Sequence, residues 1–295
     1  MLDLMKLNIE KPKKIIDINK LGLDKIEVLP NGNIRIGALV KNSDLAYHPI
    51  IKEKYPVLSQ ALLSGASPQL RNMASVGGNL MQRTRCPYFY SRDFACNKRD
   101  PGSGCEAIDG YNRHNAILGT SDKCIATHPS DMCVAMAALG ATIEVQATKG
   151  PRIILFDEFH LLPGQTPQAE HALIPGELIT HVEIPAIPYA TKSYYLKVRD
   201  RQSYEFALCS AAVVLDVKNR HIQKAHIALG GVGTKPWRAF YAEKLLAGAP
   251  VHEHSYRKAA EAALGEAKEY KDNAFKIELA KRTLIRALTI VGDMA

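Results

Sequence analysis

Residues 74–90 read ASVGGNLMQRTRCPYFY and join two chemically distinct features, a pair of glycines and the first of a group of cysteines. Gly77 and Gly78 let the backbone approach a ligand closely, and they leave amide groups free to face phosphate or ring oxygens. Ser75 and Asn79 add side-chain donors at the two ends of this loop. A glycine pair is more often a plain turn, so the loop gains meaning only from its surroundings.

The cysteines are crowded into one part of the chain. Of the six, five lie between positions 86 and 133. Residues 82–122 show no sustained helical or strand periodicity, and structureless loops beyond roughly 12 to 15 residues are uncommon inside compact domains. Something other than a hydrophobic face must organise this segment. A metal site is the leading hypothesis, because disulfide frameworks belong mainly to small secreted domains.

The candidate metal ligands are Cys86, Cys96, Cys105 and Cys124. They are separated by 9, 8 and 18 residues, which matches neither the paired C-x-x-C spacing of zinc sites nor the compact ferredoxin run. Cys133 and Cys209 lie in apolar runs, and both are predicted to be core residues because free cysteine commonly behaves as a small buried hydrophobe.

Basic residues surround this quartet. They are Arg83, Arg85, Arg92, Lys98, Arg99, Arg113 and Lys123. Four thiolates on an oxidised [4Fe–4S] cluster carry a total charge of about −2, and nearby cations favour holding and reducing it. The alternative is a solvated basic loop with free thiols.

Two further polar positions gain meaning only from a ligand. Asp131, in the sequence His128-Pro129-Ser130-Asp131, either caps the following helix or accepts a hydrogen bond from a ligand. Lys197 is ordinarily an exposed lysine on a strand.

Hydrophobic patterning predicts an α+β fold in two parts, with residues 1–190 forming the first domain and 191–295 a smaller α+β domain. In the first part we expect the end of a helix at residues 2–7, a strand at 14–18, a hairpin around 30–33, helices from 45 and over 57–63, an apolar helix from 130 to 140, strands around 150 and a strand at 181–185. Residues 42–44 are expected to cap the helix that starts near 45. In the second part we expect strands within 192–200, 207–217 and 221–232, then helices near 239–246, 256–264 and 275–291.

Several stretches together resemble the FAD-binding subunits of the molybdenum hydroxylases. They are ASVGGNLMQRTRCPYFY, the cysteine-rich segment 82–124, ATHPSDM at 126–132 and GGVGTKPWRA at 230–239. The chain is most similar to the FAD subunits of bacterial periplasmic aldehyde oxidoreductases, which carry an extra [4Fe–4S] cluster. The resemblance implies a PCMH-type FAD-binding domain of two α/β subdomains, the first truncated, followed by a flavoprotein C-terminal domain.

The resemblance also implies roles for individual residues. Ser75, Gly77, Gly78 and Asn79 match a glycine loop that contacts the FAD diphosphate and flavin. Asp131 matches an acid that contacts the cofactor, and Lys197 matches a lysine near the flavin. Leu178 and Ile179 match apolar residues that lie against the flavin ring. Cys86, Cys96, Cys105 and Cys124 match the four cluster ligands.

The N-terminus departs from the family pattern. Family members begin with a strand and a glycine-rich phosphate loop before the first helix, whereas this chain begins where that helix is already under way. The expectation is a start codon placed too late or a truncated gene, with a loss of phosphate-binding amides.

By this resemblance the chain is a redox subunit of a heterotrimer. A large subunit with a molybdenum cofactor oxidises an aldehyde to a carboxylic acid, and a small subunit with [2Fe–2S] clusters passes electrons to FAD on this chain. Two alternatives stay open: the flavin subunit of 4-hydroxybenzoyl-CoA reductase, or another hydroxylase of this family, and a non-enzymatic zinc-binding assembly protein.

Composition limits the remaining possibilities. The chain is 46% hydrophobic and 23% charged, ordinary proportions that argue against disorder. Its net charge of +8 is spread over scattered residues without a nucleic-acid-binding motif, so no nucleic-acid partner is expected. No apolar run reaches the roughly 18 to 20 residues of a membrane span, and no cleavable signal is visible. We expect export to the periplasm together with a partner's twin-arginine signal, with a cytoplasmic location as the alternative.

Overall fold

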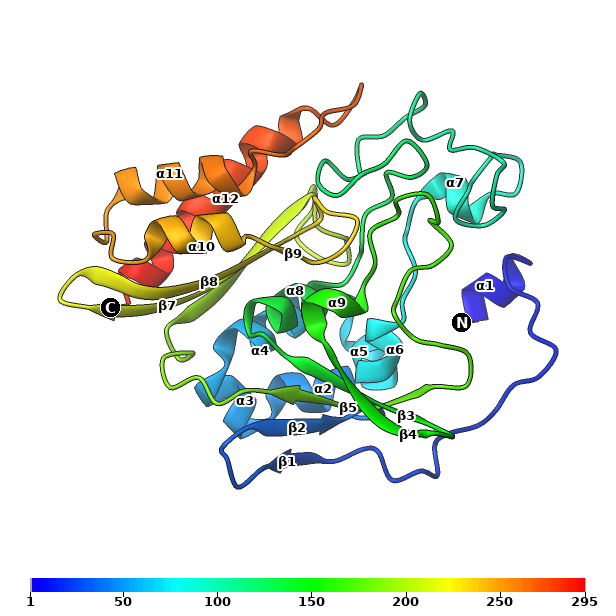
Figure 1. The fold of residues 1–295 in the computed structure, drawn as a ribbon, viewed down its shortest axis with the longest axis horizontal. Helices are drawn as coiled ribbons and strands as arrows, with labels where there is room; N and C mark the ends of the chain where they lie inside the picture. Colours follow the sequence, from blue (N-terminus) through cyan, green and yellow to red (C-terminus); the bar gives the residue numbers. More distant parts are fainter. Residues whose placement is uncertain (1, 295) are drawn as a thin grey trace.

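The computed structural model describes residues 2–294, and the side chains of residues 4–294. Two antiparallel sheets lie on either side of a layer of helices, and three further helices cover the outer face of the second sheet (Figure 1). This arrangement confirms the predicted mixed α+β class.

The first sheet has the order β1-β2-β5-β3-β4. Its strands are β1 (Ile26–Val28), β2 (Ile34–Gly37), β3 (Thr142–Ala147), β4 (Gly150–Leu155) and β5 (Leu178–Ile184). The predicted hairpin is confirmed, because Ile26 pairs with Ile36 and Val28 with Ile34. Alternate side chains such as Ile34, Ile143 and Val182 are fully buried under the helices, as expected of a sheet with one covered face.

Short helices cover that face. They are α2 (Asn42–Tyr47), α3 (Pro49–Lys54), α4 (Pro56–Ser64), α5 (Pro68–Met73) and α6 (Val76–Leu80). Three of them begin at a proline, whose missing N–H costs nothing at the first helical position. The central helix α8 (Asp131–Ala138) is buried at every residue because it lies between the two sheets.

The second sheet has the order β6-β7-β8-β9. Its strands are β6 (Ser193–Val198), β7 (Cys209–Lys218), β8 (His221–Gly230) and β9 (Trp237–Arg238). On β7, Ala212 and Val214 face the α4 and α8 side, whereas Val213 and Leu215 face the outer helices. Burial of both faces explains why this strand reads as a continuous apolar run.

The outer helices are α10 (Phe240–Leu246), α11 (Glu253–Ala263) and α12 (Phe275–Gly292). The predicted three strands and three helices of this part are therefore confirmed, and the two-residue strand β9 was missed. Residues 185–192 carry the chain from the first sheet to the second.

Two local predictions are wrong. Residues 14–18 form no strand: Ile15 and Ile16 are 63% and 70% exposed, and no neighbouring strand pairs with them. The helix expected near residue 45 begins at Asn42, and its N-cap Lys41 makes no side-chain capping bond. Backbone contacts with the glycine loop fix that start instead, since Asn42 N donates to Ala74 O at 2.8 Å.

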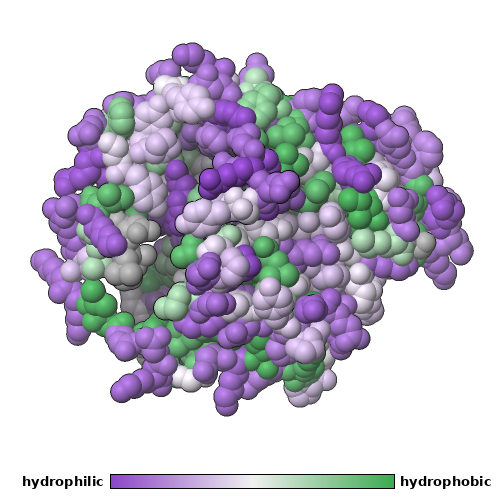
Figure 2. All heavy atoms as spheres, turned by 180° about the vertical axis from the view of Figure 1, so that it is seen from behind, coloured by the Kyte–Doolittle hydropathy of each residue, from purple (hydrophilic) through white to green (hydrophobic). Residues whose placement is uncertain are grey.

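Other short elements complete the chain. The expected N-terminal helix is α1 (Leu2–Lys6), and α7 (Pro87–Tyr90) and α9 (Phe156–Phe159) are single turns. On the face opposite to that of Figure 1, hydrophobic residues form small separated areas on a mostly hydrophilic surface (Figure 2). Within residues 2–294, no helix has the length and hydrophobicity needed to cross a membrane.

A buried lysine connects the C-terminal helix to the cysteine-rich segment. Lys276 on α12 is fully buried, and its ammonium donates to the carbonyls of His114 (3.3 Å), Asn115 (2.9 Å) and Gly231 (2.6 Å). Burial lowers the pKa of Lys276 to about 7.

Replacing Lys276 with Met keeps the length of the side chain but leaves Gly231 O without its donor, whereas His114 O keeps Thr127 Oγ1 and Asn115 O keeps Asn273 Nδ2. An unpaired carbonyl of this kind costs about 1–3 kcal/mol, so we expect Lys276→Met to lower the free energy of unfolding by about 1–3 kcal/mol in urea denaturation. The control is Lys258→Met on the exposed side of α11, which should change it by less than about 0.5 kcal/mol.

A comparison of wild-type protein with Lys276→Met also tests the pKa of Lys276. Between pH 7 and about 10.4 the unfolded lysine holds a proton that the buried one has released, so wild-type stability should rise with pH relative to Lys276→Met. Parallel stability curves for the two proteins would show that Lys276 stays charged.

Candidate functional site

The four predicted cysteine ligands lie at separate turns of residues 82–124. Cys86 precedes α7, and Cys96 and Cys105 face each other in an isolated antiparallel bridge. Cys124 closes a turn in which its carbonyl accepts from Ser121 N at 3.1 Å. Cys96 and Cys124 are buried, and Cys86 and Cys105 are partly buried.

The structure brings these four thiols into mutual electrostatic range. Burial raises the pKa of Cys86, and a charge on Cys124 raises it further. Burial also raises the pKa of Cys105, as do charges on Cys86 and Cys96. Burial is the main cause that raises the pKa of Cys124 to about 11, and charges on Cys105 and Cys96 raise it too. Burial therefore favours the protonated form of these three cysteines, and a bound metal core would supply the positive charge that holds them as thiolates.

The spacing of the sulfurs bears on the type of metal. Throughout residues 2–294 a single group of three metal-ligating side chains lies within 4.8 Å, and it contains none of these four cysteines. A tetrahedral zinc ion with Zn–S bonds of 2.3 Å would hold its sulfurs about 3.8 Å apart. The four cysteines as folded are therefore not gathered at the spacing of a single tetrahedral zinc site.

Hydrogen-bond donors reach two of the four sulfurs. Asn115 Nδ2 donates to Cys86 Sγ at 3.7 Å, and Ala126 N donates to Cys124 Sγ at 3.4 Å. Backbone amides of Tyr88 and Phe89 also point at Cys86 and lower its pKa against the effect of burial. Such donors stabilise thiolates and tune the potentials of iron–sulfur clusters.

The basic residues near the quartet make several kinds of contact. The charge of Lys98 lowers the pKa of Cys124 against the effect of burial. Arg99 instead donates to the carbonyls of Tyr88, Phe89 and Ser91, and Arg113 pairs with Asp200. Arg99 and Arg113 therefore hold the loop in shape through these contacts.

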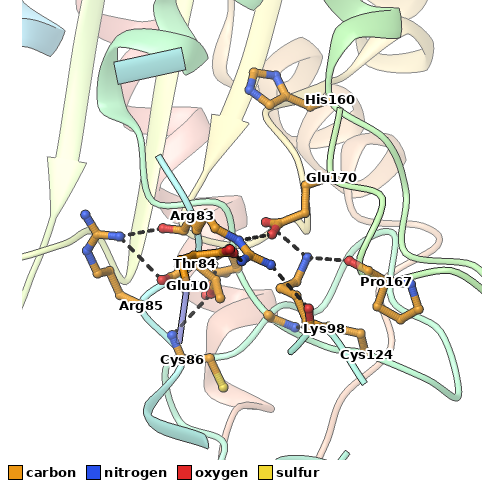
Figure 3. A network of polar contacts seen from close by, with 12 residues as sticks. Glu10, Arg83, Thr84, Arg85, Cys86, Lys98, Cys124, His160, Pro167 and Glu170 are labelled. Carbon is orange, nitrogen blue, oxygen red and sulfur yellow. Dashed lines mark hydrogen bonds and ion pairs between the residues drawn. The ribbon is translucent and has the colours of Figure 1, made fainter. Parts of the chain in front are cut away.

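An ion-pair network ties the cysteine segment to residues 167–170. Arg83 and Lys98 both pair with Glu170, and Lys98 Nζ also donates to Pro167 O at 3.0 Å. Figure 3 shows Glu170 pointing between the two cations, with Cys86 and Cys124 on the same side of the network.

The glycine loop folds as the short helix α6. Ser75 caps it by accepting from Gly78 N at 3.2 Å, and Gly77 N donates to Ala38 O at 2.8 Å. The expectation that these two amides are free is therefore wrong. Gly77 serves close packing instead, because a Cβ there would stand 3.1 Å from both Ala38 Cβ and Ala38 O.

Asp131 and Lys197, predicted separately, are direct partners. Lys197 Nζ lies 2.8 Å from Asp131 Oδ2, and Tyr195 OH donates to Asp131 Oδ1 at 2.6 Å. Helix capping falls to Ser130, whose Oγ accepts from Cys133 N at 3.0 Å and donates to Asn79 Oδ1 at 2.6 Å. Ser130 thus connects the start of α8 to the glycine loop.

The apolar pair on β5 points to opposite faces of the sheet. Ile179 is 5% exposed and belongs to the core, whereas Leu178 is partly buried. Ala38 N donates to Thr180 O at 2.8 Å, so β5 passes directly beside the contact of Gly77 with Ala38.

A cavity of about 180 Å³ adjoins both groups of predicted residues. It is lined by Cys86 on one side and by Ser130 and Asp131 on the other. A second cavity of about 420 Å³ is lined by Leu80 and Met81, which end the glycine loop, and by Lys98 of the cysteine segment. Cys86 and the start of α8 therefore border a common space.

Sequence reasoning missed four residues of this site: Tyr195, Asn115, Glu170 and Lys276. Tyr195 carried a usable signal, since it lies two residues before Lys197 on a strand and so shares its face. Asn115 bonds to Cys86 across 29 positions, Glu170 to Arg83 across 87 and Lys276 to Asn115 across 161, which no local pattern reveals.

Comparisons with known proteins agree with this architecture. Residues 1–187 match the model of the FAD binding domain in molybdopterin dehydrogenase, and residues 194–291 match that of the CO dehydrogenase flavoprotein C-terminal domain. The chain therefore belongs to the FAD-binding subunits of the molybdenum hydroxylases, a family of oxidoreductases, as the sequence resemblance implied.

Within this family, one relative is much more similar than the others compared. The chain is 50% identical over 289 residues to the aldehyde oxidoreductase FAD-binding subunit PaoB of Escherichia coli strain K12, covering 98% of this chain and 87% of PaoB. It is 28% identical to the glyceraldehyde dehydrogenase medium chain of Sulfolobus acidocaldarius, covering 86% and 72% of the two chains. A crystal structure of Cu,Mo-CO dehydrogenase shares the fold with a TM-score of 0.75 at 24% identity, covering 100% of this chain and 87% of that one.

The ion pair between Lys197 and Asp131 gives a stability test. Lys197→Met leaves a buried carboxylate without its cation, so the free energy of unfolding should fall by about 3–5 kcal/mol. The double variant Lys197→Met/Asp131→Asn should lose less than the sum of the two single variants. Lys224→Met, at an exposed position on β8, is the control. Additive losses in this cycle would show that the two side chains are not coupled.

Proposed function

We propose that this chain is the FAD- and [4Fe–4S]-binding electron-transfer subunit of a molybdenum-dependent aldehyde oxidoreductase. The convergence of Cys86, Cys96, Cys105 and Cys124, with amide donors aimed at their sulfurs, carries the iron–sulfur part of the proposal. The 50% identity to a subunit named for aldehyde oxidation supports the substrate class.

The proposed assembly is a heterotrimer with a large molybdenum-cofactor subunit and a small [2Fe–2S] subunit. FAD, when bound, supplies the electron-transfer chemistry that links those centres to an external acceptor. Several relatives are named as medium chains or subunits of larger enzymes, which supports a division of labour between chains. We further propose that the complex is exported to the periplasm with a partner's signal, which cell fractionation tests.

The chain's own residues position the cofactors. Asp131, held by Lys197 and Tyr195, presents a fixed carboxylate at the wall of the smaller cavity. Leu178 on β5 is proposed for the apolar contact with FAD, and the side chains of Ser75 and Asn79 are proposed for the polar contacts, whereas Ile179 packs in the core. The amides of Gly77 and Gly78 are already bonded, so in this arrangement they do not donate to the diphosphate.

The cluster has a mainly structural role in this proposal. Residues 82–124 contain one helix of four residues and close through polar contacts, so a core held by four thiolates would fix the loop. Cys105→Ser should lower iron content, acid-labile sulfide, soluble yield and melting temperature together, in complex purified without oxygen.

Cys209→Ala is the matched control, because Cys209 is a fully buried cysteine of the second core, outside the quartet. It should keep full iron, sulfide and flavin content. A Cys105→Ser complex with normal stability and slowed electron transfer would contradict the structural role, and zinc without sulfide in wild-type protein would contradict the cluster itself.

A further inference from the structure

Three side chains apart from the cysteine quartet form a compact group of metal-ligating atoms. Atoms of His128, Cys133 and His160 all lie within 4.8 Å of one another. His128 precedes α8, Cys133 lies in its first turn and His160 follows α9, so the packing of these segments assembles the group. The two imidazole centroids are 4.4 Å apart.

Two buried ring nitrogens in this group have no partner. His160 is only 6% exposed, and its Nε2 lies 3.2 Å from Leu80 O, to which it must donate because a carbonyl only accepts. His160 Nδ1 therefore carries a free lone pair, and it is buried without a hydrogen bond. His128 Nε2 is also buried and unpartnered.

Such orphan atoms are costly and need an explanation. A buried polar atom without a partner costs about 1–3 kcal/mol, and here two lie on touching rings. The contact of His160 with Leu80 is the arrangement that orients metal-binding histidines, whose second nitrogen donates to a backbone carbonyl. Burial also lowers the pKa of His160 to about 4, so its imidazole is neutral at pH 7.

We propose that His128, Cys133 and His160 bind a zinc ion, as a site separate from the four-cysteine quartet. One thiolate and two neutral imidazoles are ligands that Zn²⁺ prefers, and three protein ligands leave a fourth position for water. The cavity of about 420 Å³ is lined by His128 and His160, so that position is open to exchange. Binding releases one proton, from the thiol of Cys133, as the zinc–sulfur bond forms.

The geometry requires a small adjustment. Zinc bonds of about 2.0–2.3 Å separate ligands by roughly 3.3–3.8 Å, so the group contracts by about an ångström. His128 Nδ1 accepts a long hydrogen bond of 3.4 Å from Ser130 N, which is lost when the proton moves to Nδ1. Because Lys98 and Arg85 lie in electrostatic range of His128, the thiolate of Cys133 is needed to offset the added charge.

The test uses the complex purified without oxygen, with its iron content intact, exposed to Zn²⁺ and then dialysed. Wild-type protein should retain one additional zinc per chain by mass spectrometry. Cys133→Ala and His160→Phe should each weaken zinc affinity at least 10-fold without changing iron content. Cys209→Ala, which removes another buried cysteine, should retain the zinc.

A second measurement uses wild-type protein, so its result does not depend on whether the variants fold correctly. Zinc-edge X-ray absorption should show two nitrogen, one sulfur and one further light neighbour. Four sulfur neighbours, or zinc that disappears in Cys105→Ser but not in Cys133→Ala, would place the ion on the quartet and overturn the proposal. Failure to retain stoichiometric zinc would overturn it too. Iron content, measured separately, reports on the proposed cluster.

Discussion

Residues 82–124 form a long segment with a single four-residue helix. The folded conformation of this segment therefore depends on sulfur and polar contacts. Four cysteines are buried or partly buried there, and burial raises the pKa of three of them. Amides from Asn115 and Ala126 reach two of the sulfurs. These donors stabilise thiolates more than thiols, so the environment is prepared for a charged core.

The rest of the fold holds this segment from both sides. Glu170 binds it to the loop after α9 through Arg83 and Lys98. Lys276 binds it to α12 and to the end of β8 through three carbonyls. Glu170 comes from a loop near the first sheet, and Lys276 comes from a helix on the second sheet. The cysteine segment therefore contacts both parts of the chain and is more than a surface insertion.

The start of α8 is the point where the functional elements meet. Ser130 bonds to the glycine loop, Asp131 bonds to β6 and Cys133 faces the two histidines. A helix buried on all sides holds these groups rigidly. The cavity between Asp131 and Cys86 then lies between two fixed walls.

The sequence patterns predicted most helices and strands, but they did not predict which polar groups would bond to one another. The alternation around residues 30–33, the apolar helix after Ser130 and the three strands of the second sheet followed from periodicity, and the structure confirms them. The strand predicted at residues 14–18 is wrong, because an apolar pair there has no partner strand. The free amides expected at Gly77 and Gly78 are bonded, since their partners Ala38 and Ser75 are set by tertiary packing and a capping side chain. The roles of the four cysteines rested on family resemblance, because their spacing alone fits no standard motif.

A cubane held by Cys86, Cys96, Cys105 and Cys124 is the feature on which the proposed function of this chain depends most. Its most direct test is low-temperature EPR of the dithionite-reduced complex, integrated against the [2Fe–2S] signals that persist at higher temperature. The account predicts a fast-relaxing [4Fe–4S] signal of about one spin per chain. A spectrum fully explained by [2Fe–2S] centres and flavin radical, in protein with complete occupancy of those centres, would contradict it.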